Sequence, residues 1–86
     1  MAEIINNEKG FKVIKVSIIE IANWGGFGIC DWCDGYVGSH GYYVAVLHTV
    51  MCEKCYKEWC ERATYYPEDK HVEDRHFNYM KIILNL

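Results

Sequence analysis

Apolar and polar residues follow different periods along the chain, and the first patterned segment runs from Phe11 to Ile21. It is rich in β-branched residues and carries polar Lys12 and Glu20 near its ends. This composition predicts a strand over residues 11–21 that is covered on parts of both faces or contains a bulge. Alternation places Ile14, Val16 and Ile18 on one face, and Phe11, Val13, Ile19 and Ile21 on the other.

The next stretch, residues 22–29, interrupts this pattern. Three glycines within four residues allow positive φ angles, which predicts a loop that carries Trp24 and Phe27. A further turn or loop is expected at residues 38–41. Residues 42–47 (YYVAVL) have the composition of a strand, residues 48–49 of a turn and residues 50–51 of a short return strand. A β-hairpin is therefore predicted here.

Residues 53–65 show the helical period instead. Two acid-before-base pairs at a spacing of four, Glu53–Lys57 and Glu58–Arg62, favour a helix. Pro67 ends this helix or begins the next element. The apolar stripe of the helix consists of Tyr56, Trp59, Cys60 and Ala63.

Charged residues dominate residues 67–76 (PEDKHVEDRH), which predicts a solvated connector. Asp74 is then the expected cap of a last helix, and a strand over residues 80–86 is the alternative. In the helix, the residues expected to face the core are Phe77, Met80, Ile83 and Leu84.

These segments predict an α+β fold in a single domain of residues 1–86. The chain has 51% hydrophobic and 24% charged residues, as expected for one small globular domain. Domains of this size often need a metal, a disulfide or a partner for stability. No apolar run approaches the roughly 20 residues that span a bilayer. Residues 1–9 lack the features of a signal peptide, so a cytoplasmic location with reduced thiols is expected.

The cysteines give the strongest chemical signal. Cys30/Cys33 and Cys52/Cys55 are two Cys-x-x-Cys pairs separated by 18 residues, a spacing typical of four-thiolate zinc sites. Cys52 would cap the predicted helix and Cys55 would be its third residue, where free N–H groups and the helix dipole stabilise thiolates. Gly35 is expected to supply the unusual backbone angle of the first turn.

Other uses of paired cysteines fit the sequence less well. Two disulfides suit a secreted domain, and a redox Cys-x-x-Cys requires a thioredoxin-like βαβ context. Iron held by the same four thiolates stays an alternative, because its ligands overlap with those of zinc. Four cysteines would close the coordination sphere, so we expect a structural ion whose binding free energy is largely folding free energy.

The remaining cysteine and the four histidines are further candidate ligands. Cys60 lies on the apolar stripe, and we expect a small buried hydrophobe rather than a ligand or nucleophile. His40 or His48 could replace a thiolate, although four suitable thiolates are already present. His71 and His76 could hold a second metal with nearby acidic residues, but their five-residue spacing suits a solvated charged face better.

The sequence contains no recognisable catalytic set. It has no Gly-x-Ser-x-Gly, no phosphate loop and no His-Glu-x-x-His, and its only serines are Ser17 and Ser39. We therefore expect that the protein is not an enzyme.

The motif CDWCDG at residues 30–35, a hairpin, and CEKC at residues 52–55 opening a helix resemble the treble-clef class of zinc fingers. The resemblance covers residues 27–65. It implies a knuckle that donates the first cysteine pair and a helix that donates the second from its first turn. It does not imply one function, because treble clefs bind nucleic acids, proteins and small molecules.

Charge and aromatic content point towards a protein partner. The net charge is −3 with only nine Lys and Arg, so direct nucleic-acid binding is not expected and a basic protein surface is the better partner. Aromatic residues make up 15% of the chain, and exposed tyrosines are typical interface anchors. The expected partner-contacting residues are Glu53, Glu58, Glu61, Glu68, Asp69, Glu73, Asp74, Tyr65 and Tyr66.

In size, acidity, aromatic content and its CDWCDG and CEKC motifs, the chain is also similar to small metal-containing anti-CRISPR proteins of phages and mobile elements. That resemblance implies an inhibitor in the host-cell cytoplasm that binds a Cas9-type nuclease and blocks DNA loading or activation without chemistry. Such nucleases hold their duplex in a positively charged channel. The alternatives are a nucleic-acid-binding zinc ribbon or finger of a mobile element and, third, a redox or metal sensor using Cys60.

Overall fold

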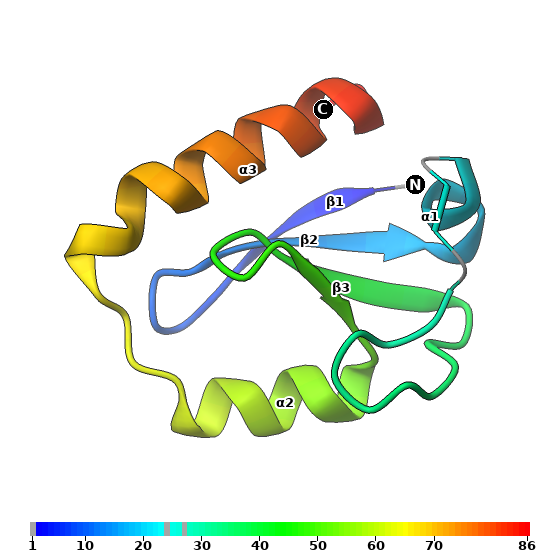
Figure 1. Ribbon diagram of the computed structural model, residues 1–86, viewed down its shortest axis with the longest axis horizontal. Coiled ribbons are helices and arrows are strands. Elements are labelled where there is room, and N and C mark those ends of the chain that lie inside the picture. Colours follow the sequence, from blue (N-terminus) through cyan, green and yellow to red (C-terminus); the bar gives the residue numbers. More distant parts are fainter. Residues whose placement is uncertain (1, 24, 27) are drawn as a thin grey trace.

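An antiparallel sheet with the strand order β1-β2-β3-β4 lies at the centre of the computed structural model, which describes residues 2–23, 25–26 and 28–86 (Figure 1). Each strand pairs with its neighbour in sequence. The loop positions expected for Trp24 and Phe27 lie outside the described residues. The strands are β1 (Glu3–Asn6), β2 (Lys12–Ser17), β3 (His40–Val44) and β4 (Thr49–Met51).

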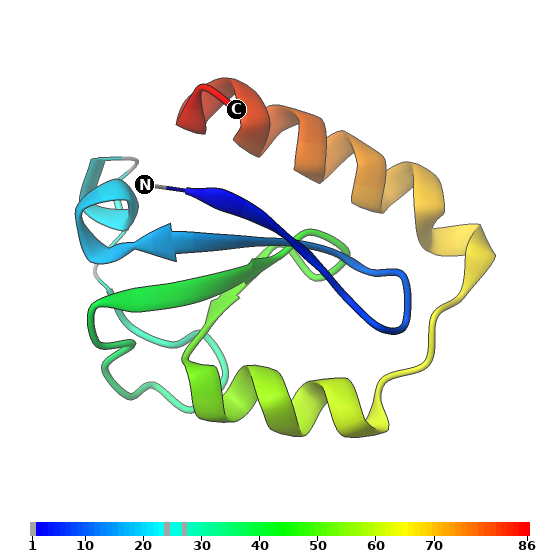
Figure 2. The ribbon, with the colours of Figure 1, turned by 180° about the vertical axis from the view of Figure 1, so that it is seen from behind.

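Two helices cover opposite faces of this sheet. Figures 1 and 2 show α2 (Glu53–Arg62) along one face and α3 (Lys70–Leu84) along the other. Tyr42 of β3 stacks on Tyr56 of α2 with ring centroids 4.5 Å apart. The next residue, Tyr43, points to the opposite face and lines a cavity with Tyr79 and Met80 of α3. The molecule is therefore a mixed domain of helices packed on one antiparallel sheet.

Both faces of β2 are covered, as its composition predicted, but the strand is shorter than expected. It ends at Ser17, and residues 18–21 belong to the helix α1 (Ile18–Asn23) instead of the strand. The cause is a capping box: Ser17 Oγ accepts the Glu20 N–H at 3.2 Å, and Glu20 Oε1 accepts the Ser17 N–H at 2.9 Å. These reciprocal bonds start a helix despite the β-branched sequence.

The sequence pattern did not predict β1. Its four residues pair with β2, and Ile4 lies opposite Ile14. Three of the four are exposed, including Ile4 at 51% exposure. A strand at the edge of a sheet with little burial has too short an alternation to be recognised from sequence alone.

The predicted hairpin is present with shifted bounds. β3 begins at His40 rather than residue 42 and ends at Val44, and β4 follows after a turn at residues 45–48. A Cβ atom at Gly41 would lie 2.8 Å from Val50 Cγ1, so this glycine allows the strands to pack closely. The turn contains His48 at a φ of 53°.

The prediction of a solvated connector at residues 67–76 is wrong. The 3₁₀-helix η1 (Pro67–Asp69) leads directly into α3, which begins at Lys70. Asp74 therefore does not cap the helix, and it forms ion pairs with Lys12 and Lys70 instead. Many charged residues of this stretch face solvent on a helix that is docked by its other side.

The rest of α3 is helical, so the alternative strand over residues 80–86 is also wrong. Phe77 and Met80 are buried as expected, and Leu84 packs against the core, whereas Ile83 is 37% exposed. None of the helices in the described ranges is long and apolar enough to cross a membrane.

Candidate metal centre

The first cysteine pair lies in a tight turn between α1 and β3. The Cys30 N–H donates to the Gly35 carbonyl at 2.7 Å, and the Asp34 N–H donates to the Cys30 carbonyl at 2.9 Å. Asp34, with a φ of 61°, adopts the left-handed conformation. The prediction that Gly35 supplies this angle is wrong. Gly35 instead leaves room for sulfur, because a Cβ there would lie 3.2 Å from Cys33 Sγ.

Asp31 joins this turn to the sheet. Its backbone N–H donates to the Val50 carbonyl, and its carboxylate accepts the Val50 N–H, both at 2.9 Å. The side chain thereby completes a pair of hydrogen bonds like those between strands. This contact places the first cysteine pair beside β4, from which the chain leads directly to the second pair.

The second pair lies at the start of α2, as predicted. Cys52 is the N-cap residue, with extended backbone angles, and its carbonyl accepts the Tyr56 N–H at 2.9 Å. Cys55 is the third residue of the helix and is buried. The positive end of the helix dipole therefore lies beside the sulfur atoms.

The sulfur atoms of the four cysteines predicted as metal ligands form one cluster. Those of Cys30, Cys33, Cys52 and Cys55 all lie within 4.8 Å of one another, and the Cys33 and Cys52 Sγ atoms are 4.0 Å apart. A tetrahedral zinc ion with Zn–S bonds of about 2.3 Å requires S–S separations of about 3.8 Å. None of these cysteines forms a disulfide. The four cysteines are positioned to bind a metal ion.

The thiols of this cluster are electrostatically unequal. Burial acts to raise the pKa of Cys30, but N–H groups of Cys52, Cys33 and Trp32 outweigh it and lower that pKa to about 7. Burial raises the pKa of Cys55 far above its usual range, and the neighbouring cysteines raise it further. A cation would remove the repulsion among the four thiolates and hold all of them deprotonated.

The cluster is partly shielded from water. Cys30 and Cys55 are buried, whereas Cys33 is exposed and Cys52 is intermediate. The Arg62 guanidinium lies 5.2 Å from the centroid of the Trp32 ring, which joins the cysteine turn to the far end of α2. Arg62 was expected to pair with Glu58 but stacks here instead.

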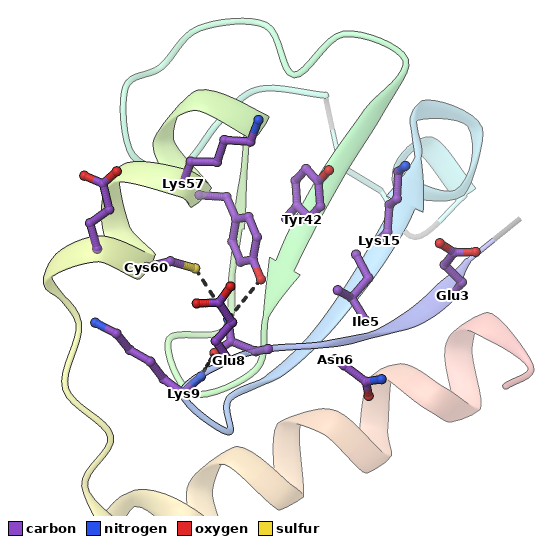
Figure 3. A pocket seen from close by; sticks show the side chains of 12 residues that line it. Glu3, Ile5, Asn6, Glu8, Lys9, Lys15, Tyr42, Lys57 and Cys60 are labelled. Carbon is purple, nitrogen blue, oxygen red and sulfur yellow. Dashed lines mark hydrogen bonds between the residues drawn. The ribbon is translucent and has the colours of Figure 1, made fainter.

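Cys60 is half-buried and lies outside this cluster. Its sulfur accepts a hydrogen bond from Asn7 Nδ2 at 3.4 Å, and the same nitrogen donates to the Tyr56 hydroxyl at 3.0 Å (Figure 3). Cys60 also packs against the hydrophobic core. It lines a cavity of about 530 Å³ between α2, β1 and the turn that follows β1. Cys60 was expected to be a small buried hydrophobe, but it is only half-buried. One side of it packs against the core and the other faces the cavity.

The histidines are not brought to the cysteines. Among the described residues, the four cysteines form the only group of three or more candidate ligands close enough to share an ion. His40 hydrogen-bonds Ser39, and His71 is exposed on α3. His48 and His76 pack against each other with ring centroids 4.4 Å apart.

The residues predicted to contact a partner lie on α2, η1 and α3 and in the segment between α2 and η1. The α2 side chains Glu53, Glu58 and Glu61 are exposed, and Glu53 forms the expected pair with Lys57 at 3.2 Å. Glu68 and Asp69 of η1 are also exposed, and so is Tyr66, whereas Tyr65 packs edge-on against Phe11 with ring centroids 5.3 Å apart.

Two of the predicted partner-contacting acids are occupied within the fold. Glu73 is 1% exposed and accepts the Lys12 N–H at 2.9 Å, so its carboxylate is not available at the surface. Asp74 is held between Lys12 and Lys70, and both lysines keep the pKa of its carboxyl below the usual range. The exposed acidic residues of the predicted set are therefore those of α2 and η1.

Sequence reasoning missed Asp31 as a support of the cluster. Its position inside CDWCDG was visible, but its bonding to Val50 depends on how the turn docks on β4. The Ser-x-x-Glu pattern of Ser17 and Glu20 was a usable signal for α1. Comparisons of the chain with family models, curated proteins and solved structures find no match.

Proposed function

We propose that the chain is a zinc-stapled protein-interaction module with a treble-clef-like metal centre. The observation that carries this proposal is the group of four cysteine sulfurs within 4.8 Å at the start of α2. Zinc is the ion that favours four thiolates in closed tetrahedral structural sites. The ion holds the cysteine turn, β4 and α2 together, and iron with the same ligands is the alternative loading.

The metal has a structural role in this proposal. Four cysteines leave no open position on a tetrahedral ion, so no water or substrate is bound to it. The function then depends on the surface that the ion keeps in shape. We assign partner binding to the end of the molecule where α2 leads into α3.

Exposed acidic side chains and an exposed tyrosine follow one another closely along the chain at this end. Glu61 lies in the last turn of α2, Tyr66 is 53% exposed, and Glu68 and Asp69 follow on η1. An exposed tyrosine among carboxylates suits a basic protein surface, with the ring as an anchor and the charges aiding association. The Cas9-type nucleases implied by the resemblance to anti-CRISPR proteins have such surfaces, and binding there would block DNA loading or activation.

The test is a pull-down of a Cas9–guide complex by the zinc-loaded protein. Asp69→Lys should weaken capture at least tenfold, whereas Glu3→Lys, the same charge change on β1, should not. Equal capture by both variants would contradict the assigned surface. Salt-sensitive retention on duplex DNA without capture of the nuclease would instead support a nucleic-acid-binding zinc finger.

A further inference from the structure

Two of the four histidines join segments that are far apart in the chain. His48 lies in the turn between β3 and β4, and His76 lies on α3. Their ring centroids are 4.4 Å apart with a tilt of 31° between the rings. His76 Nδ1 also lies 2.8 Å from the Ala45 carbonyl oxygen in the same turn. The two side chains therefore form a contact between α3 and the hairpin.

The hydrogen bonds limit where protons are placed on the two rings. A carbonyl oxygen only accepts, so His76 must carry its proton on Nδ1 to donate to Ala45. His48 Nδ1 lies 2.6 Å from the Tyr43 hydroxyl. Burial and the neighbouring Tyr79 raise the pKa of Tyr43 well above its usual range, so the hydroxyl keeps its proton and is able to donate it to an unprotonated His48 Nδ1. His48 is neutral in the docked state while its Nδ1 accepts this bond.

We propose that His48 and His76 form a proton-sensitive latch that holds α3 on the hairpin at neutral pH and releases it in acid. Protonation of His48 at Nδ1 requires the Tyr43 hydroxyl to stop donating. A second proton on His76 would place two cations 4.4 Å apart. Like charges at that distance repel, and separation of α3 from the turn relieves the repulsion.

The charged and titratable groups around the latch do not compensate for a proton on His48. Burial lowers the pKa of His48 and His76 lowers it further, whereas Asp31 of the cysteine turn acts in the opposite direction. From α3, Tyr79 lies beside Tyr43, and the Glu73 carboxylate is bonded to the Lys12 N–H. Asp74 of α3 is already paired with Lys12 and Lys70. The net effect on His48 is a lowered pKa.

The direction of the pH effect follows from this shift. The pKa of His48 is lower in the folded protein than its ordinary value of 6.5, so the unfolded or released state binds the proton more tightly. The stabilising contribution is fully present above about pH 6.5 and is lost as the pH falls through the folded pKa. Each proton taken up on release makes opening about tenfold more favourable per pH unit.

The experiment is amide hydrogen exchange of the zinc-loaded protein between pH 7.5 and 5.5, with rates converted to protection factors. We expect the protection of α3 to fall about tenfold or more while α2 and the sheet keep theirs and zinc stays bound. His40→Gln and His71→Gln, two histidines outside the contact, should behave as wild type. His48→Gln should remove most of the pH dependence.

Three results would overturn the latch. They are constant α3 protection in the wild type, the same fall in His48→Gln, and a simultaneous loss of α2 and α3 with zinc release. Glu73→Gln serves as a second control, because Glu73 is the buried carboxylate one turn before His76. If this variant alone removed the pH dependence, the proton would act at Glu73 rather than at the histidines. The proposal does not depend on the identity of any partner.

Discussion

Asp31 connects the chemistry of the cysteine turn to the sheet through one side chain. Its carboxylate accepts the N–H of buried Val50, and its own N–H bonds the Val50 carbonyl. The residue therefore fixes where the first two sulfur atoms stand relative to the start of α2. A substitution of Asp31 should therefore alter the position of the first cysteine pair.

Replacement of Asp31 by alanine leaves the Val50 N–H without its acceptor. We expect Asp31→Ala to lower the free energy of unfolding of the zinc-loaded protein by about 1–3 kcal/mol. Asp31→Asn keeps an acceptor oxygen and should lose clearly less. Urea denaturation of both variants measures the difference, and an equal loss would show that the side-chain bond contributes little.

Glu73 is an acidic residue that is buried between β2 and α3. It is 1% exposed, its Oε2 accepts the Lys12 N–H, and its Oε1 has no hydrogen-bond partner among the described residues. Burial of a polar oxygen without a hydrogen bond opposes folding. The acid thus positions β2 against α3 at some cost in stability.

Glu73→Gln keeps an acceptor for the Lys12 N–H and replaces the carboxyl group with an amide. We expect it to be as stable as the wild type at neutral pH or about 1 kcal/mol more stable. Glu73→Leu should be less stable, since the Lys12 N–H then has no acceptor. Thermal unfolding at pH 7 gives both values. A large destabilisation by glutamine would mean that the fold needs the carboxyl group itself.

At the scale of elements, patterns were informative where the local sequence decides the structure. The start of α2 follows from Cys52 and the apolar stripe, and the hairpin follows from two apolar runs around a turn. The prediction of a strand at residues 18–21 is wrong because the Ser17–Glu20 capping box outweighs the β-branched composition. β1 was missed because its order comes from pairing with β2.

The helix α3 shows how a charged sequence can hide a docked element. The composition of its polar first half predicts a solvated connector, but one side of this half bonds β2 and the other faces water. Its apolar residues likewise fall on two sides. Phe77 and Met80 are buried, whereas Tyr79 and Ile82 are exposed at 57% and 77%. The side of α3 that docks on the sheet depends on tertiary contacts, and the spacing of apolar residues along the helix does not reveal it.

This asymmetry gives a matched pair of variants. Phe77→Ala removes a ring that is 7% exposed and packed between Lys12 and Lys81, and we expect a loss of about 3–5 kcal/mol. Ile82→Ala should change stability by no more than about 0.5 kcal/mol, because that side chain is exposed. Chemical denaturation compares them. Similar losses in both would mean that α3 packs by a different face.

At the scale of the whole molecule, the cysteine spacing predicted the grouping of sulfurs correctly. Two short pairs separated by 18 residues need only one hairpin between them to meet, so a local rule was sufficient. The supports of that site, Asp31 and Arg62, were not predictable because they depend on the docking of the turn. The same holds for the histidine contact between the hairpin and α3.

Removal of the metal should destabilise the domain as a whole. We expect a strong chelator to lower the melting temperature by more than 15 °C and to reduce helical circular dichroism, since metal binding and folding are coupled. Cys55→Ser should behave like the chelated protein. Cys60→Ser should retain one metal ion per chain by elemental analysis. Native melting without metal would refute a structural ion.

The place of α3 in the chain has a consequence for synthesis. All four strands, the four sulfur ligands and α2 lie within residues 3–62, ahead of α3. A ribosome therefore releases a sheet and a complete set of ligands before the helix that covers its second face. During that interval the side of the sheet formed by Ile14 and Tyr43 lacks its cover. Metal capture by the nascent chain would then decide how long this uncovered intermediate survives proteases and chaperones.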